Sequence, residues 1–277
     1  MFRCLELAEL GAGSVAPNPR VGCVIVQHDK IIGEGFHREY GGLHAEVNAI
    51  KAVTNPEKLR ESTLYVNLEP CAHHGLTPPC SDLIVEKQIP RVVIGTADPF
   101  SEVAGRGIKK LKNAGVEVEV GILEKECRTL NRRFFTFHEK KRPYIVLKWA
   151  QTLDGFIDIE RHTEKYGAPT WITGDLALRL VHKIRSEENA ILVGTQTAEK
   201  DNPSLTVRYW PGNDPMRILI DKELRLPRSL KLFDGNFETL VFNNLKNEKK
   251  GKTTLLKIDF KQSIIPQLLG ELSRQKI

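Results

Sequence analysis

Two short motifs, far apart in the sequence, constrain the fold of this chain more than any other feature. The first is His44-Ala45-Glu46, and the second begins with Pro70-Cys71 and ends, after eight intervening residues, at Cys80. One imidazole and two thiols form a zinc-ligand set of the catalytic kind, in which the fourth coordination position stays open for water. A fold that uses this set must bring residues 44, 71 and 80 to one point.

Glu46 lies two residues from the histidine, where it can move protons without binding the metal. The combination H-x-E…P-C-x-x-C is the signature of zinc nucleobase deaminases, although the excursion between the thiols is longer here. Zinc lowers the pKa of its bound water toward about 7, which supplies hydroxide at neutral pH. We predict hydrolytic deamination by this hydroxide, with Glu46 as the catalytic acid and base.

Two other interpretations of the motif stay open at this point. A closed structural zinc site needs four protein ligands, and His73 or His74 could supply the fourth. The chain could also bind no metal at all. An H-x-E sequence at a helix start favours the catalytic interpretation.

Strands and helices alternate through the first half of the chain. Helices are predicted at about Phe2–Leu10, His44–Val53, Cys80–Lys87, Gly107–Asn113 and Leu123–His138, and strands at Val21–Gln27, Ile31–Gly35, Thr63–Leu68, Arg91–Gly95 and Val116–Val120. This alternation is typical of a mostly parallel central sheet covered by helices on both faces. Both halves of the metal motif lie at strand ends and helix starts, where such folds present catalytic groups.

A charged, proline-ended bridge at Glu139–Pro143 separates the two halves, and we predict domains over residues 1–141 and 142–277. The second domain starts with a buried-type strand at Tyr144–Ala150, and Lys246–Lys252 is predicted to be a polar loop. Its other predicted strands are Ala190–Gly194, Met216–Asp221, Thr239–Asn243 and Thr254–Ile258, and its helices are Asp175–Glu187 and Ser263–Gln275.

Composition narrows the class of protein. The net charge of +6 is mild and the basic residues are scattered, which is typical of an ordinary solvated surface. No apolar run is long enough to cross a bilayer, and the acids Glu6 and Glu9 interrupt the N-terminal run, unlike a signal peptide. Five cysteines without a secretory start indicate reduced thiols. We therefore expect a cytoplasmic protein with no nucleic-acid or membrane partner.

Two further residues are candidates for ligand contact. Two prolines fix the backbone of the loop Ala16–Gly22, which is useful if Asn18 must present its amide to a ring or sugar edge. An ordinary strand-entry turn is the alternative. His37 is a lone histidine, for which the sequence alone favours a packing role.

Taken together, these motifs resemble the RibD family of bifunctional riboflavin-biosynthesis enzymes. The motifs that resemble the family's deaminase half are Ala16–Gly22, His44–Glu46, Glu69–Cys71 with Thr77–Cys80, and Ala104–Gly107. The motifs that resemble its reductase half are Lys148, Thr152–Gly155, Trp171–Gly174, Gly194–Thr197 and Asp201–Thr206. The resemblance covers essentially the whole chain, and the longer gap between the thiols is typical of this family rather than of tRNA adenosine or cytidine deaminases.

The resemblance implies a fold and two reactions. The fold is α/β: a cytidine-deaminase-like three-layer α/β/α domain followed by a partial dihydrofolate-reductase-like α/β domain. The first domain of the family hydrolyses the 2-amino group of a diaminopyrimidinone ribosylamine 5′-phosphate. The second uses NADPH to reduce the ribosyl side chain to ribityl. We also expect a homo-oligomer.

The resemblance also implies roles for individual residues. Zinc falls on His44, Cys71 and Cys80, the proton donor is Glu46, and Asn18 and His37 contact the deaminase substrate. In the second domain, the NADP-contacting positions are Ala150, Trp171, Thr197 and Asp201. The substrate-contacting positions are Arg185, Leu205 and Arg208, and arginine is well suited to a 5′-phosphate.

Several features depart from the family pattern. Leu76 stands where the family often has Lys, Pro169 stands where it commonly has a substrate-binding Ser, and Glu160–Ala168 is longer and more charged. Family reductase halves continue into a buried strand and a glycine-rich phosphate-binding segment, whereas this sequence stops at Ile277. We therefore expect an open sheet edge and an inactive or poorly folded reductase half beside a complete deaminase half.

Two other functional classes predict features that differ from those of a pyrimidine deaminase. A nucleic-acid base editor predicts a P-C-x-x-C core and a basic, aromatic-rich groove, and the sequence has neither. A degenerate scaffold protein would hold zinc yet release no ammonia from the pyrimidine substrate.

Overall fold

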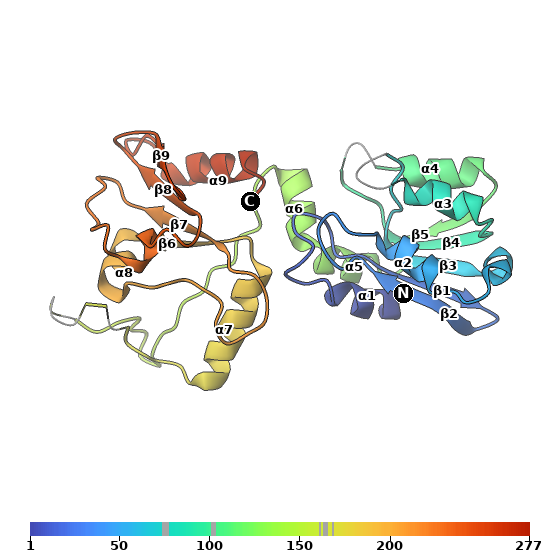
Figure 1. The fold of residues 1–277 in the computed structure, drawn as a ribbon, viewed down its shortest axis with the longest axis horizontal. Helices are drawn as coiled ribbons and strands as arrows, with labels where there is room; N and C mark the ends of the chain where they lie inside the picture. Colours follow the sequence, from blue (N-terminus) through green and yellow to red (C-terminus); the bar gives the residue numbers. More distant parts are fainter. Residues whose placement is uncertain (74–77, 101–103, 161, 163–165, 168) are drawn as a thin grey trace. The chain divides into compact units, whose positions relative to one another are not determined.

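Two separate five-stranded sheets organise the chain (Figure 1). The computed structural model describes residues 1–277 except 74–77, 101–103, 161, 163–165 and 168. The described chain divides into two units, Met1–Tyr144 and Ile145–Ile277, each with its own sheet. No helix among the described residues is both long and apolar enough to span a membrane.

Unit 1 alternates strands and helices as the sequence predicts. Its strands are β1 Gly22–Gln27, β2 Lys30–Phe36, β3 Thr63–Leu68, β4 Arg91–Thr96 and β5 Glu117–Val120. Its helices are α1 Phe2–Glu9, α2 Ala45–Lys51, the 3-10 helix η1 Pro56–Glu61, α3 Cys80–Glu86, α4 Arg106–Asn113, α5 Glu124–Leu130 and α6 Arg132–Lys140.

The sheet of unit 1 is mixed rather than mostly parallel. Its strand order is β2-β1-β3-β4-β5, in which β1 pairs antiparallel with both β2 and β3, and β3, β4 and β5 are parallel. His28 and Asp29 join β1 to β2 with φ values of 46° and 59°. Positive φ at both central residues is typical of a type I′ turn, and so tight a turn requires antiparallel strands.

Helices cover both faces of this sheet (Figure 1), which gives the predicted three layers. On one face, α1 packs Cys4 and Leu7 against Val24 of β1. On the other face, α2, α3 and α4 pack against alternate residues of β1, β3 and β4. A Cβ added at Gly35 of β2 would lie 2.3 Å from the backbone nitrogen of Ala49, so only glycine lets α2 approach this closely.

The single helix predicted over Leu123–His138 is wrong, because the chain breaks at Asn131 into α5 and α6. The Asn131 side chain is 2% exposed and is used for tertiary hydrogen bonds. Its Oδ1 accepts the Arg20 backbone N–H at 2.8 Å, and its Nδ2 donates to the Arg20 carbonyl at 2.9 Å. Asn67 donates to the same carbonyl at 3.0 Å. Two buried amides therefore fix the end of the loop that carries Asn18.

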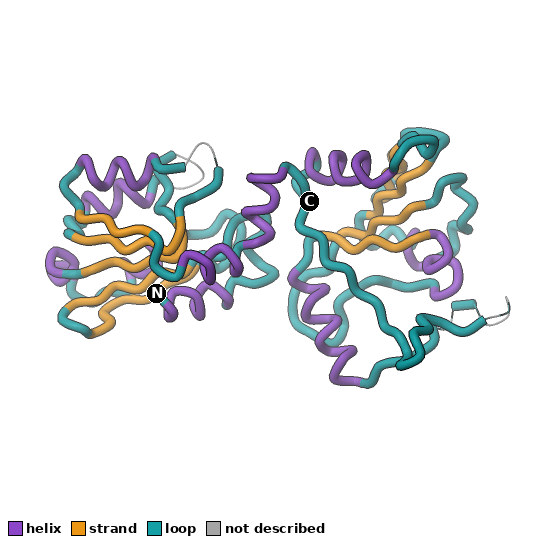
Figure 2. Tube along the Cα trace, turned by 180° about the vertical axis from the view of Figure 1, so that it is seen from behind, coloured by secondary structure: helices purple, strands orange, loops and turns teal. Residues whose placement is uncertain are grey.

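The sheet of unit 2 is parallel except at one edge. Its strands are β6 Ala190–Gly194, β7 Met216–Ile220, β8 Thr239–Asn243, β9 Glu248–Lys250 and β10 Thr253–Lys257, in the order β6-β7-β8-β10-β9, and only β9 is antiparallel to its neighbour. Figure 2 draws the strands of each unit in orange and the helices in purple. Its helices are α7 Asp175–Glu187, α8 Thr195–Asp201, the 3-10 helix η3 Lys231–Phe233 and α9 Ile264–Arg274.

Two apolar clusters fill the two faces of the second sheet. Leu268 and Leu272 of α9 pack on Ile218 and Phe242. Ala198 of α8 and the segment 226–232 pack on Leu219, Val241 and Leu255, which point to the opposite face. The core of unit 2 therefore has the period-two alternation expected of buried strands.

Two predicted elements of unit 2 are wrong. Residues 145–150 form no strand, and Leu147 and Trp149 are 78% and 62% exposed. An apolar run becomes a strand only where a neighbouring strand supplies backbone partners, and among the described residues β6 pairs only with β7. The predicted loop Lys246–Lys252 instead contains β9, because β10 offers it an antiparallel partner.

Replacing Asn131 with Ala tests whether its side chain anchors the Arg20 backbone. The change leaves both backbone groups of Arg20 without this partner, so we expect the free energy of unfolding to fall by about 1–3 kcal/mol in urea titrations. Asn113→Ala, at the exposed end of α4, is the matched control and should change it by less than about 0.5 kcal/mol. Equal effects of the two substitutions would contradict the anchoring role.

Candidate metal centre and its surroundings

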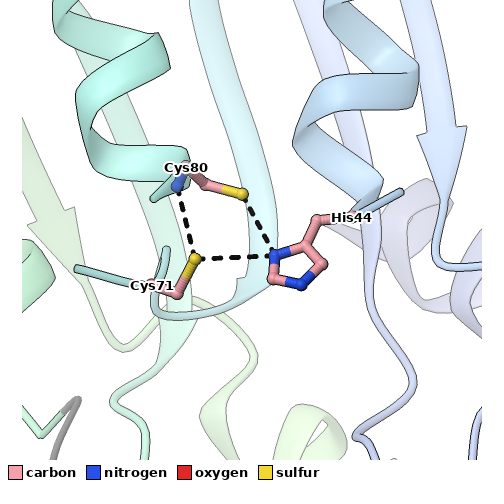
Figure 3. Close-up of side chains that lie close together, drawn as sticks. All are labelled: His44, Cys71 and Cys80. Carbon is pink, nitrogen blue, oxygen red and sulfur yellow. Dashed lines mark hydrogen bonds between the residues drawn. The ribbon is translucent and has the colours of Figure 1, made fainter. Parts of the chain in front are cut away.

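The three predicted zinc ligands converge from three places in unit 1. His44 is the N-cap of α2, Cys80 is the first residue of α3, and Cys71 lies in the segment that follows β3. Their ligand atoms all lie within 4.8 Å of one another. His44 Nδ1 is 3.2 Å from Cys80 Sγ and 3.5 Å from Cys71 Sγ (Figure 3).

These distances fit a zinc ion. With Zn–S of about 2.3 Å and Zn–N of about 2.0–2.1 Å, tetrahedral coordination separates a nitrogen ligand from a sulfur ligand by roughly 3.5 Å. The Cys80 backbone N–H also donates to Cys71 Sγ at 3.3 Å, which fixes that sulfur beside the start of α3. The donor set, one nitrogen and two sulfurs, is the set that borderline-soft zinc prefers.

The electrostatics of the two thiols favour a thiolate at this point. The hydrogen bond from the Cys80 thiol, opposed by burial and helped by the His44 ring, lowers the pKa of Cys71 well below its ordinary value. The same hydrogen bond, together with burial, raises the pKa of Cys80. Cys71 is therefore the thiol of the pair that loses its proton more readily, and a thiolate is the form of cysteine that binds metal.

Glu46 lies beside the ligands but is not one of them. It is 4% exposed, in the first turn of α2. Burial raises its pKa, and the charge of His44 opposes that shift. A carboxyl with a raised pKa is a stronger base than an exposed one, so Glu46 is suited to exchange protons with a bound molecule.

Asn18 and His37 lie together next to His44. The Asn18 Nδ2 is 3.2 Å from His37 Nε2, and the His37 ring meets the His44 ring edge-on at 5.6 Å. His37 Nδ1 donates to the Leu43 carbonyl at 3.0 Å, so its Nε2 accepts from the Asn18 amide. Burial lowers the pKa of His37, which keeps the ring neutral in this arrangement. The predicted substrate-contacting pair is thus brought to the metal centre.

Sequence reasoning missed the role of Glu69. Its carboxylate is 4% exposed and accepts four backbone N–H groups, those of Asp98, Gly105, Gly107 and Ile108, at 2.9–3.2 Å. A Cβ added at Gly107 would lie 2.0 Å from the Pro70 carbonyl oxygen. Glu69 therefore ties the Ala104–Gly107 motif and the start of α4 to the segment that carries Cys71. An acid directly before Pro70 was the available signal.

The alternative of a closed zinc site named His73 or His74 as a fourth ligand, and His73 is not part of the metal-ligand group. Among the residues that the structure describes, the metal-ligand group holds His44, Cys71 and Cys80. The ring of His73 faces Phe100 edge-on at 6.3 Å instead. His74 and Leu76 lie outside the described residues.

The predicted substrate residues of unit 2 also come together. Arg185 on α7 donates to the Thr206 carbonyl at 2.6 Å, and Leu205, buried with φ at 57°, precedes that residue. The Arg208 guanidinium donates to the hydroxyls of Ser204 and Thr206. Burial and the charge of Arg208 lower the pKa of Arg185, so the two cations lie close enough to interact.

The predicted NADP-contacting residues are less closely grouped. Thr197 and Asp201 share the short helix α8. Ala150 and Trp171 lie in irregular segments, and no described hydrogen bond or ring contact joins either to Thr197. Trp171 is 66% exposed. Pro169 is exposed, and five residues of the segment 160–168 lie outside the described part of the chain.

Comparison with known families matches the two units separately. Residues 1–96 match the family described as the cytidine and deoxycytidylate deaminase zinc-binding region. Residues 143–277 match the family described as the RibD C-terminal domain.

Curated and solved relatives match across both units. The riboflavin biosynthesis protein RibD of Aquifex aeolicus is 45% identical over 254 residues, which are 91% of this chain and 69% of that protein. Escherichia coli RibD is 36% identical over 98% of this chain and 74% of its own. The crystal structure of a Thermotoga maritima deaminase/reductase superposes with a TM-score of 0.90 and 41% identity, and covers 100% of this chain and 77% of its own.

Replacing Glu69 with Gln tests the four backbone hydrogen bonds that its carboxylate accepts from Asp98, Gly105, Gly107 and Ile108. The amide nitrogen would face backbone N–H donors, so we expect a loss of about 1–3 kcal/mol in the free energy of unfolding and weaker zinc binding. Glu86→Gln, which removes only an exposed pair with Lys87, is the control and should change neither quantity. If Glu69→Gln behaved like Glu86→Gln, Glu69 would not organise these four residues.

Replacing Cys80 with Ala tests the ligand set. We expect the zinc content of the purified protein, measured by atomic emission, to fall from about one ion per chain toward zero. Cys127→Ala removes an equally buried thiol outside the cluster and should leave the zinc content unchanged. Full zinc occupancy in Cys80→Ala would remove this thiol from the site.

Proposed function

Because this chain belongs to the RibD family, the bifunctional deaminases and reductases of riboflavin biosynthesis, we propose that its first domain, residues 1–141, deaminates a diaminopyrimidinone ribosylamine 5′-phosphate. The Thermotoga maritima relative is a diaminohydroxyphosphoribosylaminopyrimidine deaminase and 5-amino-6-(5-phosphoribosylamino)uracil reductase. The observation that carries the proposal is the convergence of His44, Cys71 and Cys80 beside buried Glu46.

The residues of the metal centre have separate tasks in this reaction. His44, Cys71 and Cys80 would hold zinc, which supplies the Lewis acidity that makes water a competent nucleophile at neutral pH. Glu46 would take a proton from that water and deliver it to the adjacent ring nitrogen. As the water oxygen bonds to the amino-bearing carbon, it becomes a hydroxyl; Glu46 would then take the remaining proton from this hydroxyl and give it to the amino group, so that ammonia departs and a carbonyl is left. Its raised pKa supports both the uptake and the return of a proton.

Asn18 and His37 would orient the pyrimidine. The Asn18 amide N–H is directed to His37 Nε2, which leaves the Asn18 carbonyl oxygen to accept a hydrogen bond from an amino group of the ring. His37 is held by the Leu43 carbonyl and remains neutral, so it keeps Asn18 in one orientation. This pair would select an amino-substituted ring over one with oxygen at the same position.

The second domain, residues 142–277, would bind a nicotinamide cofactor and the sugar phosphate. We assign NADPH contacts to Ala150, Trp171, Thr197 and Asp201, and substrate contacts to Leu205 and the two arginines Arg185 and Arg208. The grouping of Arg185 and Arg208 supports an anionic ligand, because the two cations repel each other and a bound anion would offset that repulsion. We further propose a cytoplasmic homo-oligomer.

Replacing Glu46 with Gln is the sharpest test of the deaminase. The amide keeps the shape of the side chain but cannot carry protons, so we expect zinc to remain bound while the rate of ammonia release falls by about 10²–10⁴ or more. Glu57→Gln, on the exposed side of the 3-10 helix η1, is the control and should retain the wild-type rate. Unchanged turnover in Glu46→Gln would exclude this carboxylate from the mechanism.

A further inference from the structure

Among the described residues, three that lie outside the segment Ser204–Tyr209 of unit 2 hold it by hydrogen bonds. Arg185 donates to the Thr206 carbonyl at 2.6 Å, and Asp214 accepts the Val207 backbone N–H. The third bond comes from a histidine that no motif singled out: His182 Nδ1 accepts the Arg208 backbone N–H at 2.9 Å. The segment carries one of the two arginines assigned above to the sugar phosphate.

His182 is built into the interior of unit 2. It lies on α7, one turn before Arg185, and is 1% exposed. Its ring meets the Tyr209 ring edge-on at 4.9 Å, with an interplanar angle of 85°. Because Nδ1 accepts a hydrogen bond, the proton of the neutral ring sits on Nε2.

The charged groups around His182 favour the neutral form of its ring. Arg185, Arg208 and Asp214 are the charged groups that act on the ring. Burial, and then the two arginines, lower the pKa of His182 to about 4, and Asp214 opposes them. A cationic ring could not accept the Arg208 N–H, so a neutral histidine keeps this bond throughout the physiological pH range.

The two arginines have unused donors. The Arg185 Nε atom is buried and has no hydrogen-bond partner within the part of the chain that the structure describes. The Arg208 Nη1 atom donates to the hydroxyls of Ser204 and Thr206, which leaves its remaining N–H groups for a ligand. Arg185 is fixed by its helix α7. Both side chains can therefore contact one ligand only if the backbone of Arg208 is held at the right distance from α7.

We propose that His182 is a positioning residue for this arginine pair: by accepting the Arg208 backbone N–H, it holds the Ser204–Tyr209 segment so that Arg208 and Arg185 grip one phosphate group together. The inference rests on the proposed function of the second domain, in which a sugar phosphate is the substrate. It adds a residue that acts through Arg208 and touches no ligand itself.

The test compares His182→Asn with His182→Leu in the full chain. Asn places Oδ1 close to the position of His Nδ1 and keeps the acceptor, whereas Leu keeps apolar volume and removes it. The probe is ribose 5-phosphate, with its dissociation constant measured by calorimetry. We expect Leu to weaken binding about tenfold and Asn to stay within about threefold of wild type, because only Leu removes the hydrogen-bond acceptor that holds the Arg208 backbone. Arg185→Gln and Arg208→Gln should each weaken binding more strongly and show that the probe occupies this site.

The possible outcomes separate the two proposals. Wild-type affinity in His182→Leu, with both arginine variants impaired, would overturn the role of His182 and leave the proposed function intact. Equal weakening in the Asn and Leu variants would also overturn it, because ring packing rather than the acceptor would then matter. If wild type itself did not bind ribose 5-phosphate, the proposed reductase function and the inference would both fail. A long-range ¹H–¹⁵N spectrum of the wild-type histidines provides a readout that needs no variant: a proton on Nδ1 of His182 contradicts the proposal.

Discussion

The approach of two helix starts to the end of one strand is the constraint on which the deaminase unit depends. His44 begins α2, Cys80 begins α3, and Cys71 follows β3, and all three donor atoms lie within 4.8 Å of one another. This convergence requires α2 to lie close to β2, which Gly35 permits by having no side chain. It also requires the segment after β3 to be fixed, and the Glu69 carboxylate does this with four backbone N–H groups. Packing and hydrogen bonds thus already bring the three donor atoms together, and a bound metal ion would stabilise this arrangement further.

Much of the metal centre could be predicted from sequence because its information is local. The spacing of H-x-E and of the two thiols predicted the three ligands, which the structure brings together, and it singled out Glu46, which the structure buries in the first turn of α2. The alternation of strands and helices predicted that they lie at element ends. The contacts that support them could not be predicted in this way. The amides of Asn67 and Asn131 grip the Arg20 backbone across sequence separations of 47 and 111 residues, and no local pattern marks such partners. The helix break at Asn131 was missed for the same reason, since helix propensity carries no information about a distant backbone group.

The failures in unit 2 also have a physical cause. The run from Tyr144 to Ala150 has the composition of a buried strand. A β-strand, however, needs a neighbouring strand for its backbone hydrogen bonds, and no described strand pairs with this run. Conversely, Glu248–Lys250 is too polar to be predicted as a strand but pairs with β10. His182 carried no signal either, because its role depends on a backbone N–H that lies 26 residues away. Pairing and tertiary hydrogen bonds therefore set the limit of what sequence patterns reveal here.

The central claim is that one imidazole and two thiolates of this chain hold a zinc ion whose fourth position is open. X-ray absorption at the zinc edge of the purified protein measures this coordination directly. The prediction is two sulfur neighbours at about 2.3 Å, one imidazole nitrogen at about 2.0–2.1 Å and one further light atom that belongs to no side chain. A second imidazole bound to the metal, or fewer than two sulfurs, would contradict the claim.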